Sequence, residues 1–480
     1  MDAAEALFWA SSVHFAERQL NLMSTVKKAV GKDLTKGSVL NGLIMFVIPI
    51  ILTNLVQQLY SMVDLMVIGK YVGNVGTVGV SVGGEVSDFL TPVATAFATA
   101  GQIYIAQLAG ANQVKQQKKA IGTFIVLMMG MSLAFMAVSV ALNTPLLKLF
   151  NCPEEAFSQA RDYLIITSIG LPFIFGYNCV CGILRGMGES KRPLIFICVA
   201  AVVNIVLDLL LVVVIPMEAA GTAIATAASQ LASFAAAFAF MYKYRETFDF
   251  QLKLSYFKID KQSCKVILSL GIPQAFRSIL VRVSMVWVNS NVNAYGMIES
   301  GTNNIGNKLQ KFLEIFSASM SQAAGAMIGQ NLGASEHKRA KQVTIWALCL
   351  SSAVAAVISA VVLGWPHALF GIFTNNADVL DMGVTYLNIM IVHFFASAVT
   401  GSFQAMVIGT GNAKLNFLIG ILDGVVCKVG FSLVFVQLMS MGVYGYFWGT
   451  AVSRILPGII CILYYFSERW KSSRLFEKTA

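Results

Sequence analysis

Long apolar runs separated by short polar segments make up most of the chain. Twelve of these runs reach roughly 20 residues, the length that an α-helix needs to cross the hydrocarbon core of a bilayer. The second, seventh and eighth runs carry charged residues and are the least apolar of the set. The pattern therefore predicts an all-α membrane protein with twelve transmembrane helices. The predicted spans cover residues 38–63, 86–109, 119–143, 160–184, 193–215, 219–242, 263–292, 306–332, 342–364, 383–408, 415–438 and 442–466.

Composition and charge add a topology to this prediction. Apolar residues make up 57% of the chain and charged residues 12%, whereas the charged fraction of soluble domains is about 25%. Most of the 34 basic residues lie in the tails and in every second connection, including 110–120, 243–265 and 333–341, while 151–157 and 373–381 contain several acids. Basic segments mark the cytoplasmic side, so we expect both termini in the cytoplasm. Because this topology accounts for the net charge of +10, nucleic acid is not a predicted partner.

The cysteines, the histidines and the N-terminus carry little functional information. The eight cysteines are scattered and most lie in apolar runs, so we expect small buried side chains and not disulfides. The four histidines are too dispersed for a metal site, and we predict no cofactor. Residues 1–22 lack the pattern of a signal peptide, and Met23 opens a more usual lead into a membrane helix, so we expect translation to start there.

The two halves of the chain repeat each other. An offset of 223 residues pairs Gln107 with Gln330, Gly110 with Gly333, Tyr163 with Tyr386, and Gly186 with Gly409, and an offset of 224 pairs Pro49 with Pro273. Six spans per half is an even number, so both copies have the same orientation in the membrane. We therefore predict two six-helix lobes related by a pseudo-twofold axis along the membrane normal, with a cleft between them. The expected segments are an N-terminal tail (1–37), a first lobe (38–242), a linker (243–262), a second lobe (263–466) and a C-terminal tail (467–480).

This architecture is typical of secondary transporters. The chain contains no Walker A motif for an ATP-driven pump, and no HExxH or GxSxG motif indicates an enzyme. In addition, four segments (48–73, 101–113, 184–194 and 204–208) together resemble the multidrug and toxic compound extrusion (MATE) transporters, in particular the DinF-like bacterial branch. The resemblance covers about residues 30–466. It implies an antiporter in the plasma (inner) membrane of a bacterium, in which entry of H⁺ or Na⁺ drives export of organic compounds.

The resemblance assigns four residues to the cation or proton site. It places the acidic residue of the first span on Asp64, an Asn/Asp pair of the fifth span on Asn204 and Asp208, and a threonine of the sixth span on Thr226. It implies no such site in the second lobe, because Val281 stands at or near the place of the acid that another branch uses.

The residues alone point the same way. Asn204 and Asp208 are the two polar residues of "VVNIVLDLLLVVVI", and their spacing of four places them on one helix face. A buried aspartate is costly in a bilayer, at about 2.5–3.5 kcal/mol on insertion scales, and oxygen ligands suit either a proton or Na⁺. The alternative is a structural hydrogen bond between spans five and six.

Other polar residues of the predicted spans are candidates for the substrate cleft. On the first span, Asn54, Gln57, Gln58 and Ser61 recur at helical spacing, so we expect them to face the cleft; packing against a neighbouring helix is the alternative. On the seventh span, Arg277 and Arg282 could let the cleft accept anionic or zwitterionic compounds as well as cationic ones. Alternatively, these arginines snorkel or pair with Glu314 or Asp423.

The second and eighth spans differ in charge at matching positions. At the offset of 223, Lys308 replaces Glu85 and Lys311 replaces Asp88. We therefore predict an outer gate in which these four residues pair between the lobes and latch the inward-open state. The alternatives are a solvated helix start, or pairing of Lys311 with Glu314 within one helix.

The sequence as a whole favours a monomeric exporter of small organic compounds that works within the lipid bilayer by alternating access. Two alternatives stay open: a flippase for lipid-linked oligosaccharides or lipids with the same superfamily shape, and a membrane sensor that does not transport.

Overall fold

The computed structural model describes residues 31–246, 257–472 and 475, and every regular element in this part of the chain is helical. The predicted start at Met23 lies outside the described residues. The helices are α2 (Val39–Tyr71), α3 (Gly73–Gly110), α4 (Val114–Ala141), α5 (Asn143–Leu149), α6 (Phe157–Ile169), α7 (Leu171–Gly186), α8 (Lys191–Asp208), α9 (Glu218–Lys243), α10 (Lys261–Asn293), α11 (Met297–Gly333), α12 (His337–Gly364), α13 (Pro366–Gly371), α14 (Ala377–Gly409), α15 (Ala413–Ile421), α16 (Lys428–Leu433), α17 (Val443–Val452) and α18 (Ile455–Phe466). Short π-helical stretches follow α8 (Leu209–Val214), α15 (Leu422–Cys427) and α16 (Val434–Leu438), and 3₁₀ turns lie at Glu154–Ala156 and Arg469–Ser472.

These helices confirm the predicted all-α membrane fold. In the described residues, ten helices are long and apolar enough to cross a membrane, or eleven if α6 and α7, which meet at a 41° bend, form one span. The predicted eighth span corresponds to α11, which has 37 residues but is too polar to pass the same hydropathy test. The sequence had already placed this span among the least apolar ones.

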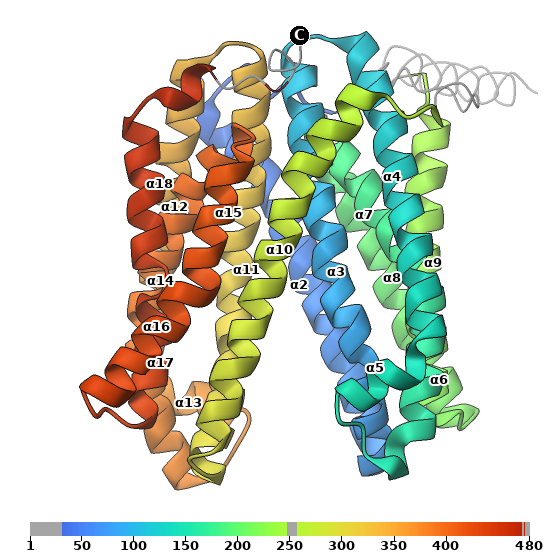
Figure 1. Ribbon diagram of the computed structural model, residues 1–480, viewed down its shortest axis with the longest axis vertical. Coiled ribbons are helices and arrows are strands. Elements are labelled where there is room, and N and C mark those ends of the chain that lie inside the picture. The colour runs from blue at the N-terminus through green and yellow to red at the C-terminus, as the bar shows by residue number, and fades with distance from the viewer. Residues whose placement is uncertain (1–30, 247–256, 473–474, 476–480) are drawn as a thin grey trace, which may run out of the picture.

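The helices form two lobes, α2–α9 and α10–α18, which meet at one end and splay apart at the other (Figure 1). The connections α3–α4, α7–α8, α11–α12 and α14–α15 and the C-terminal segment all lie at the end where the lobes meet. Since these connections carry many of the lysines and arginines, we call this the basic end and the other the splayed end. The predicted boundaries of tails, lobes and linker stay predictions, and parts of both tails and of the linker lie outside the described residues.

The first helix of each half crosses to the other half near the basic end. In α2, Leu43, Phe46 and Ile50 pack in a core with Met327 and Phe403 of the second half. Each of these helices contains a proline, Pro49 in α2 and Pro273 in α10.

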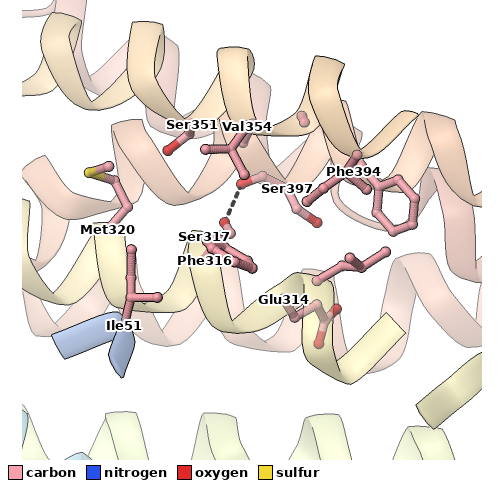
Figure 2. Close-up of a pocket in the computed structure, with 13 residues that line it drawn as sticks. Ile51, Glu314, Phe316, Ser317, Met320, Ser351, Val354, Phe394 and Ser397 are labelled. Carbon is pink, nitrogen blue, oxygen red and sulfur yellow. Dashed lines mark hydrogen bonds between the residues drawn. The ribbon is translucent and has the colours of Figure 1, made fainter. Parts of the chain in front are cut away.

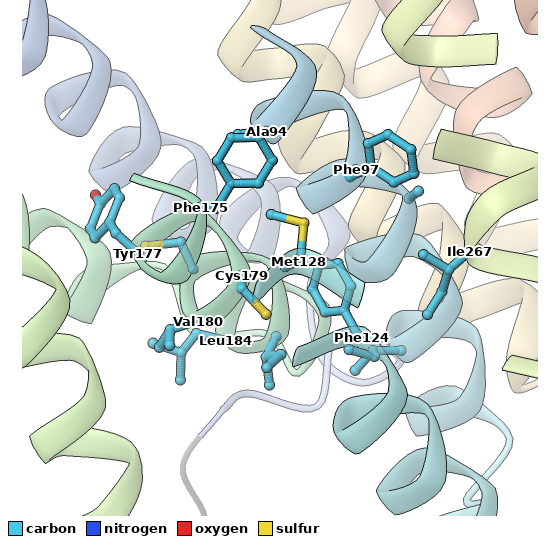
Figure 3. Packing of buried hydrophobic residues seen from close by; sticks show 14 of the residues in the cluster. Ala94, Phe97, Phe124, Met128, Phe175, Tyr177, Cys179, Val180, Leu184 and Ile267 are labelled. Atoms are coloured by element: carbon cyan, nitrogen blue, oxygen red, sulfur yellow. The ribbon is translucent and has the colours of Figure 1, made fainter. Parts of the chain in front are cut away.

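The exchange is reciprocal. In α10, Ile267 packs in the core of the first half beside Phe97 and Phe124 (Figure 3). The same core includes two of the cysteines, Cys179 and Cys181. All eight cysteines are unpaired, but only four are buried, fewer than the sequence indicated.

Repeat-related residues close the basic end symmetrically. Gln107 of α3 donates a hydrogen bond to the Gly409 carbonyl (2.8 Å), and its repeat partner Gln330 of α11 donates to the Gly186 carbonyl (2.9 Å). The carbonyl oxygens of the same two side chains accept from the backbone N–H groups of Leu475 (2.9 Å) and Leu34 (3.0 Å). Gln107 and Gln330 are buried, and so are the two glycines that they contact, Gly186 and Gly409. The two halves are therefore joined at this end by matched contacts across the pseudo-twofold axis.

Candidate functional site

Three of the four residues predicted for the cation site come together in the first lobe. Asn204 and Asp208 lie one turn apart on α8 and are fully buried, and their side chains interact with that of Asp64 on α2. Asp208 is the last residue of α8, and the π-helical stretch Leu209–Val214 follows it directly. A π-helical turn shifts the backbone hydrogen-bond register and is frequent at functional sites. The packing of α2 against α8 thus builds the site that the local spacing indicated.

The polar atoms of this cluster are not satisfied by the protein. Both carboxylate oxygens of Asp208, both amide atoms of Asn204 and one carboxylate oxygen of Asp64 are buried without a hydrogen-bond partner. Within the described residues, no lysine or arginine lies within ion-pair distance of either aspartate. Buried polar atoms normally have partners, so this cluster has the oxygen donors and the negative charge that a proton or Na⁺ requires.

Two tyrosines surround the aspartates and were not identified from the sequence as site residues. Tyr60, one turn before Asp64, accepts a hydrogen bond from the Gln230 side chain (3.2 Å) and is buried. Tyr163 of α6 lies close to Asp64 and Asp208, and the Thr226 side chain lies next to the Tyr163 hydroxyl. Thr226 therefore reaches the cluster through Tyr163. The one sequence feature that could have identified Tyr163 is its pairing with Tyr386 in the internal repeat.

A central cavity of ≈ 300 Å³ lies between the lobes. Asn54 and Gln57 line it, as predicted, but Gln58 and Ser61 do not. Asn54 also donates to the Ser319 hydroxyl of α11 (2.9 Å), so one residue serves both the cleft and helix packing. The lining residues come from six helices and the α17–α18 junction: Thr53, Asn54, Gln57, Thr91, Thr95, Thr99, Tyr177, Asn178, Arg185, Gln274, Arg277, Glu314, Ser317, Ala318, Ser321, Gln322, Gly401, Gln404, Ile408 and Arg454.

The second lobe contains a chain of ion pairs beside this cavity. Glu314 of α11 contacts His393 (2.8 Å) and Arg454 (3.5 Å). Asp423 contacts Arg454 (3.7 Å) and Arg277 (3.5 Å), which matches the alternative in which Arg277 pairs with an acid. The sequence did not identify this network as a site, because its members come from distant helices and no short spacing links them.

Glu314 lies where three cavities meet. Besides the central cavity, it lines one of ≈ 60 Å³ together with Asp423 and the buried Lys428, and another of ≈ 40 Å³ between α11, α12 and α14. Figure 2 shows the last of these, with Ser317 of α11 donating to the Ser397 carbonyl (2.9 Å). The acid is therefore reachable from the space between the lobes although Arg454 pairs with it and His393 contacts it.

In the predicted outer gate, the residue of the second lobe that pairs with the two acids is an arginine of α10 and not a lysine of α11. Arg282 of α10 forms ion pairs with Glu85 (3.0 Å) and Asp88 (3.0 Å) of α3, and does not line the central cavity. Lys308 lies over the Phe373 ring (6.0 Å) and Lys311 is exposed; in the described part of the chain neither has an ion pair. The physical reason is helix packing: α10 lies against α3, so Arg282, and not a lysine of α11, reaches the two acids.

Comparison with known proteins agrees with this geometry. Residues 49–210 and 273–455 match the profile of the MatE family. The probable multidrug resistance protein YpnP of Bacillus subtilis (strain 168) is 28% identical over 449 residues, which cover 92% of this chain and 98% of that protein. The multidrug export protein MepA of Staphylococcus saprophyticus is 23% identical over 432 residues, covering 89% of this chain and 94% of that protein.

Solved structures show the same fold. A multidrug resistance MATE family transporter in an outward-facing conformation superposes with a TM-score of 0.86 at 20% identity, covering 94% of this chain and 99% of that one. The similarity spans both lobes and supports the family without assigning a branch within it. The chain therefore belongs to the MatE family, and it is a multi-pass MATE membrane transporter and not an enzyme.

Proposed function

We propose that the protein is a secondary active exporter that exchanges H⁺ or Na⁺ for organic compounds by alternating access. The observation that carries this proposal is the pair of interacting carboxylates of Asp64, which is half-buried, and Asp208, which is fully buried; neither has a cationic partner in the described part of the chain. Two neighbouring negative charges in a medium of low dielectric constant repel each other strongly. Binding of a proton or Na⁺ removes this repulsion, and Asn204 and Thr226 add neutral oxygens.

Helix α2 connects the cation site with the cavity. Asn54 and Gln57 of α2 line the cavity, and Asp64 lies two to three turns further along the same helix. A cation that draws Asp64 and Asp208 together shifts α2 relative to α8, and the π-helical stretch after Asp208 is a place where α8 can deform. Cation binding and substrate release are thereby coupled through one helix. Transporters of this family need no cofactor, so binding and motion account for the whole cycle.

The remaining assignments follow from the same proposal. We place the basic end in the cytoplasm, because basic connections stay on the cytoplasmic side. Since the relatives are bacterial, we place the protein in the plasma membrane of a bacterium, as a monomer. Arg282 then joins the lobes through Glu85 and Asp88 on the outer half of the molecule. Since these pairs are formed in a structure whose basic end is closed, we propose an outer gate that does not latch the inward-open state. The flippase alternative is not favoured, since the relatives are multidrug exporters.

Dye transport into everted membrane vesicles tests the proposal. An imposed H⁺ or Na⁺ gradient should drive dye accumulation by the wild-type protein, and Asp208→Asn should abolish it because the pair loses a charge. Asp162→Asn, which changes an exposed aspartate of α6, should behave as wild type. A sensor would accumulate no dye under either gradient, and a lipid flippase would move only lipid-linked cargo.

A further inference from the structure

The charged residues that line the central cavity are mostly positive. They are Arg185, Arg277, Arg454 and Glu314. Arg277 and Arg454 are neutralised by the ion pairs of the second lobe, which use Glu314 and Asp423. The acids of the first lobe, Asp64 and Asp208, do not line this cavity. The cavity wall therefore differs in charge from the cation site.

Arg185 is the charge in this wall that the protein leaves without a counterion. It lies in the last turn of α7, and only 6% of its surface is exposed. Its Nη1 donates to the Gln322 side chain at 3.4 Å, its Nε is buried without a partner, and no carboxylate of the described residues lies within ion-pair distance. A buried charge without a counterion is costly, so a charge kept at the wall of a cavity points to a counterion that arrives from the cavity.

The internal repeat shows that the fold does not require arginine at this position. At the offset of 223, the counterpart of Arg185 is Ile408, which lines the opposite side of the same cavity. The next residues in each copy are Gly186 and Gly409, whose carbonyls accept the matched hydrogen bonds of the basic end. The second copy thus makes its hydrogen bond at the basic end with the apolar Ile408 before the glycine. The guanidinium of Arg185 is therefore not needed for this contact and is available for binding.

We propose that the central cavity contains an anion-binding subsite at Arg185, and that the exported compounds include organic anions with a carboxylate, sulfonate or phosphate group. The guanidinium can hold such a group with two hydrogen bonds, and Gln322, Ser321 and Asn178 line the cavity with neutral polar groups. This inference names the substrate class of the proposed exporter and rests on that function.

Equilibrium binding to the purified protein tests the subsite. 5-Carboxyfluorescein and rhodamine 123 share a xanthene core but have opposite charge, and fluorescence anisotropy measures the binding of each. Wild-type protein should bind the anionic dye, Arg185→Gln should weaken that binding at least about tenfold, and Arg185→Lys should retain part of it. Binding of rhodamine 123 should not weaken in Arg185→Gln. Arg161→Gln, which removes an exposed arginine of α6, is the control.

The outcomes separate the subsite from the exporter function. Unchanged carboxyfluorescein binding in Arg185→Gln, or binding of only the cationic dye by the wild-type protein, overturns the subsite even if dyes are exported. Carboxyfluorescein binding that depends on Arg185 without gradient-driven transport of any dye supports the subsite and overturns the exporter. If Arg185→Gln does not fold, the wild-type preference and Arg185→Lys still decide the question.

Discussion

Asp64 and Asp208 differ from the acids of the second lobe in what neutralises them. Glu314 and Asp423 have arginine partners, whereas no lysine or arginine of the described residues pairs with either acid of the first lobe. An acid with a resident guanidinium has little need of a further cation, whereas a carboxylate pair without one repels itself until a cation binds. This contrast is the basis for our proposal that the first lobe binds the cation, and that the second lobe forms a charge-balanced wall of the cavity.

Local spacing explains what could be predicted at this scale. Asn204 and Asp208 are four residues apart, and helix geometry alone fixes their common face. The partners of Glu314 could not be predicted, because His393, Arg454 and the others come from separate helices whose packing no short pattern encodes. The gate shows the same limit: the repeat identified the charge reversal at Lys308 and Lys311, but the packing of α10 on α3 selected Arg282.

Charge-reversal variants test whether Arg282 or Lys311 is the positive residue of the outer gate. Arg282→Glu places a third negative charge beside Glu85 and Asp88, so the lobes should separate further at the splayed end and cysteines placed there should react faster with a membrane-impermeant thiol reagent. Lys311→Glu changes an exposed side chain without an ion pair in the described residues and should leave the rate unchanged. A faster reaction in Lys311→Glu and an unchanged rate in Arg282→Glu would contradict this assignment and favour a gate formed by the lysines.

Hydropathy predicts the spans well but does not reveal their breaks. The predicted eleventh span, 415–438, consists of α15, α16 and two π-helical stretches, because apolar side chains satisfy the pattern whichever carbonyl each N–H reaches. The fourth span bends between α6 and α7, close to Gly170. A hydropathy pattern reports burial in lipid, and it carries no information on the hydrogen-bond register inside a helix.

The segment after α18 is attached to α12 by a charge contact with a defined pH range. Lys341 and Lys471 hydrogen-bond to Glu468 and hold the pKa of its carboxyl at about 2, below its ordinary value of 4.5. The pair is therefore fully formed above pH 4.5 and is lost as the pH falls through about 2. Next to it, the Trp470 indole is buried and donates to the Tyr465 carbonyl (2.8 Å).

Hydrogen exchange checks this attachment. Exchange of residues 466–472, corrected for the intrinsic rate, should be the same at pH 7 and pH 5 in the wild-type protein and faster in Glu468→Gln at both values. Glu336→Gln changes an exposed carboxylate at the same end and should have no effect on this segment. If Glu468→Gln exchanges like wild type, the charge contact does not hold the segment.

The whole molecule is closed at the basic end by its internal symmetry. A side chain at Gly333 would overlap the Gln107 carbonyl oxygen, and one at Gly110 would overlap the Gln330 carbonyl oxygen, so α3 and α11 approach each other there backbone to backbone. The repeat predicted these residue pairs and the two-lobe shape. It could not predict which end is closed, because both ends of the transporter contain repeat-related residues and the conformation depends on interlobe contacts.

Substitution of Gly333 tests this closure. Gly333→Ala should prevent the close approach and shift the population towards states that are open at the basic end, which double electron–electron resonance between spin labels on the two lobes would detect as longer distances. Gly130→Ala, where nothing lies within 4 Å of the new methyl group, should keep the wild-type distances. Equal distances in both variants would contradict a closure by these backbone contacts.

The central claim is that Asp64 and Asp208 bind the cation whose entry drives export, and cation flux in proteoliposomes tests it most directly. With substrate loaded on the basic side, wild-type protein should carry H⁺ (an internal pH dye) or Na⁺ (a radioactive tracer) in the opposite direction. Asp208→Asn should still bind substrate but show no substrate-dependent cation flux. Only one carboxylate remains in this variant, so the repulsion between two negative charges that favours cation binding is lost. Undiminished coupled flux in Asp208→Asn would contradict the account.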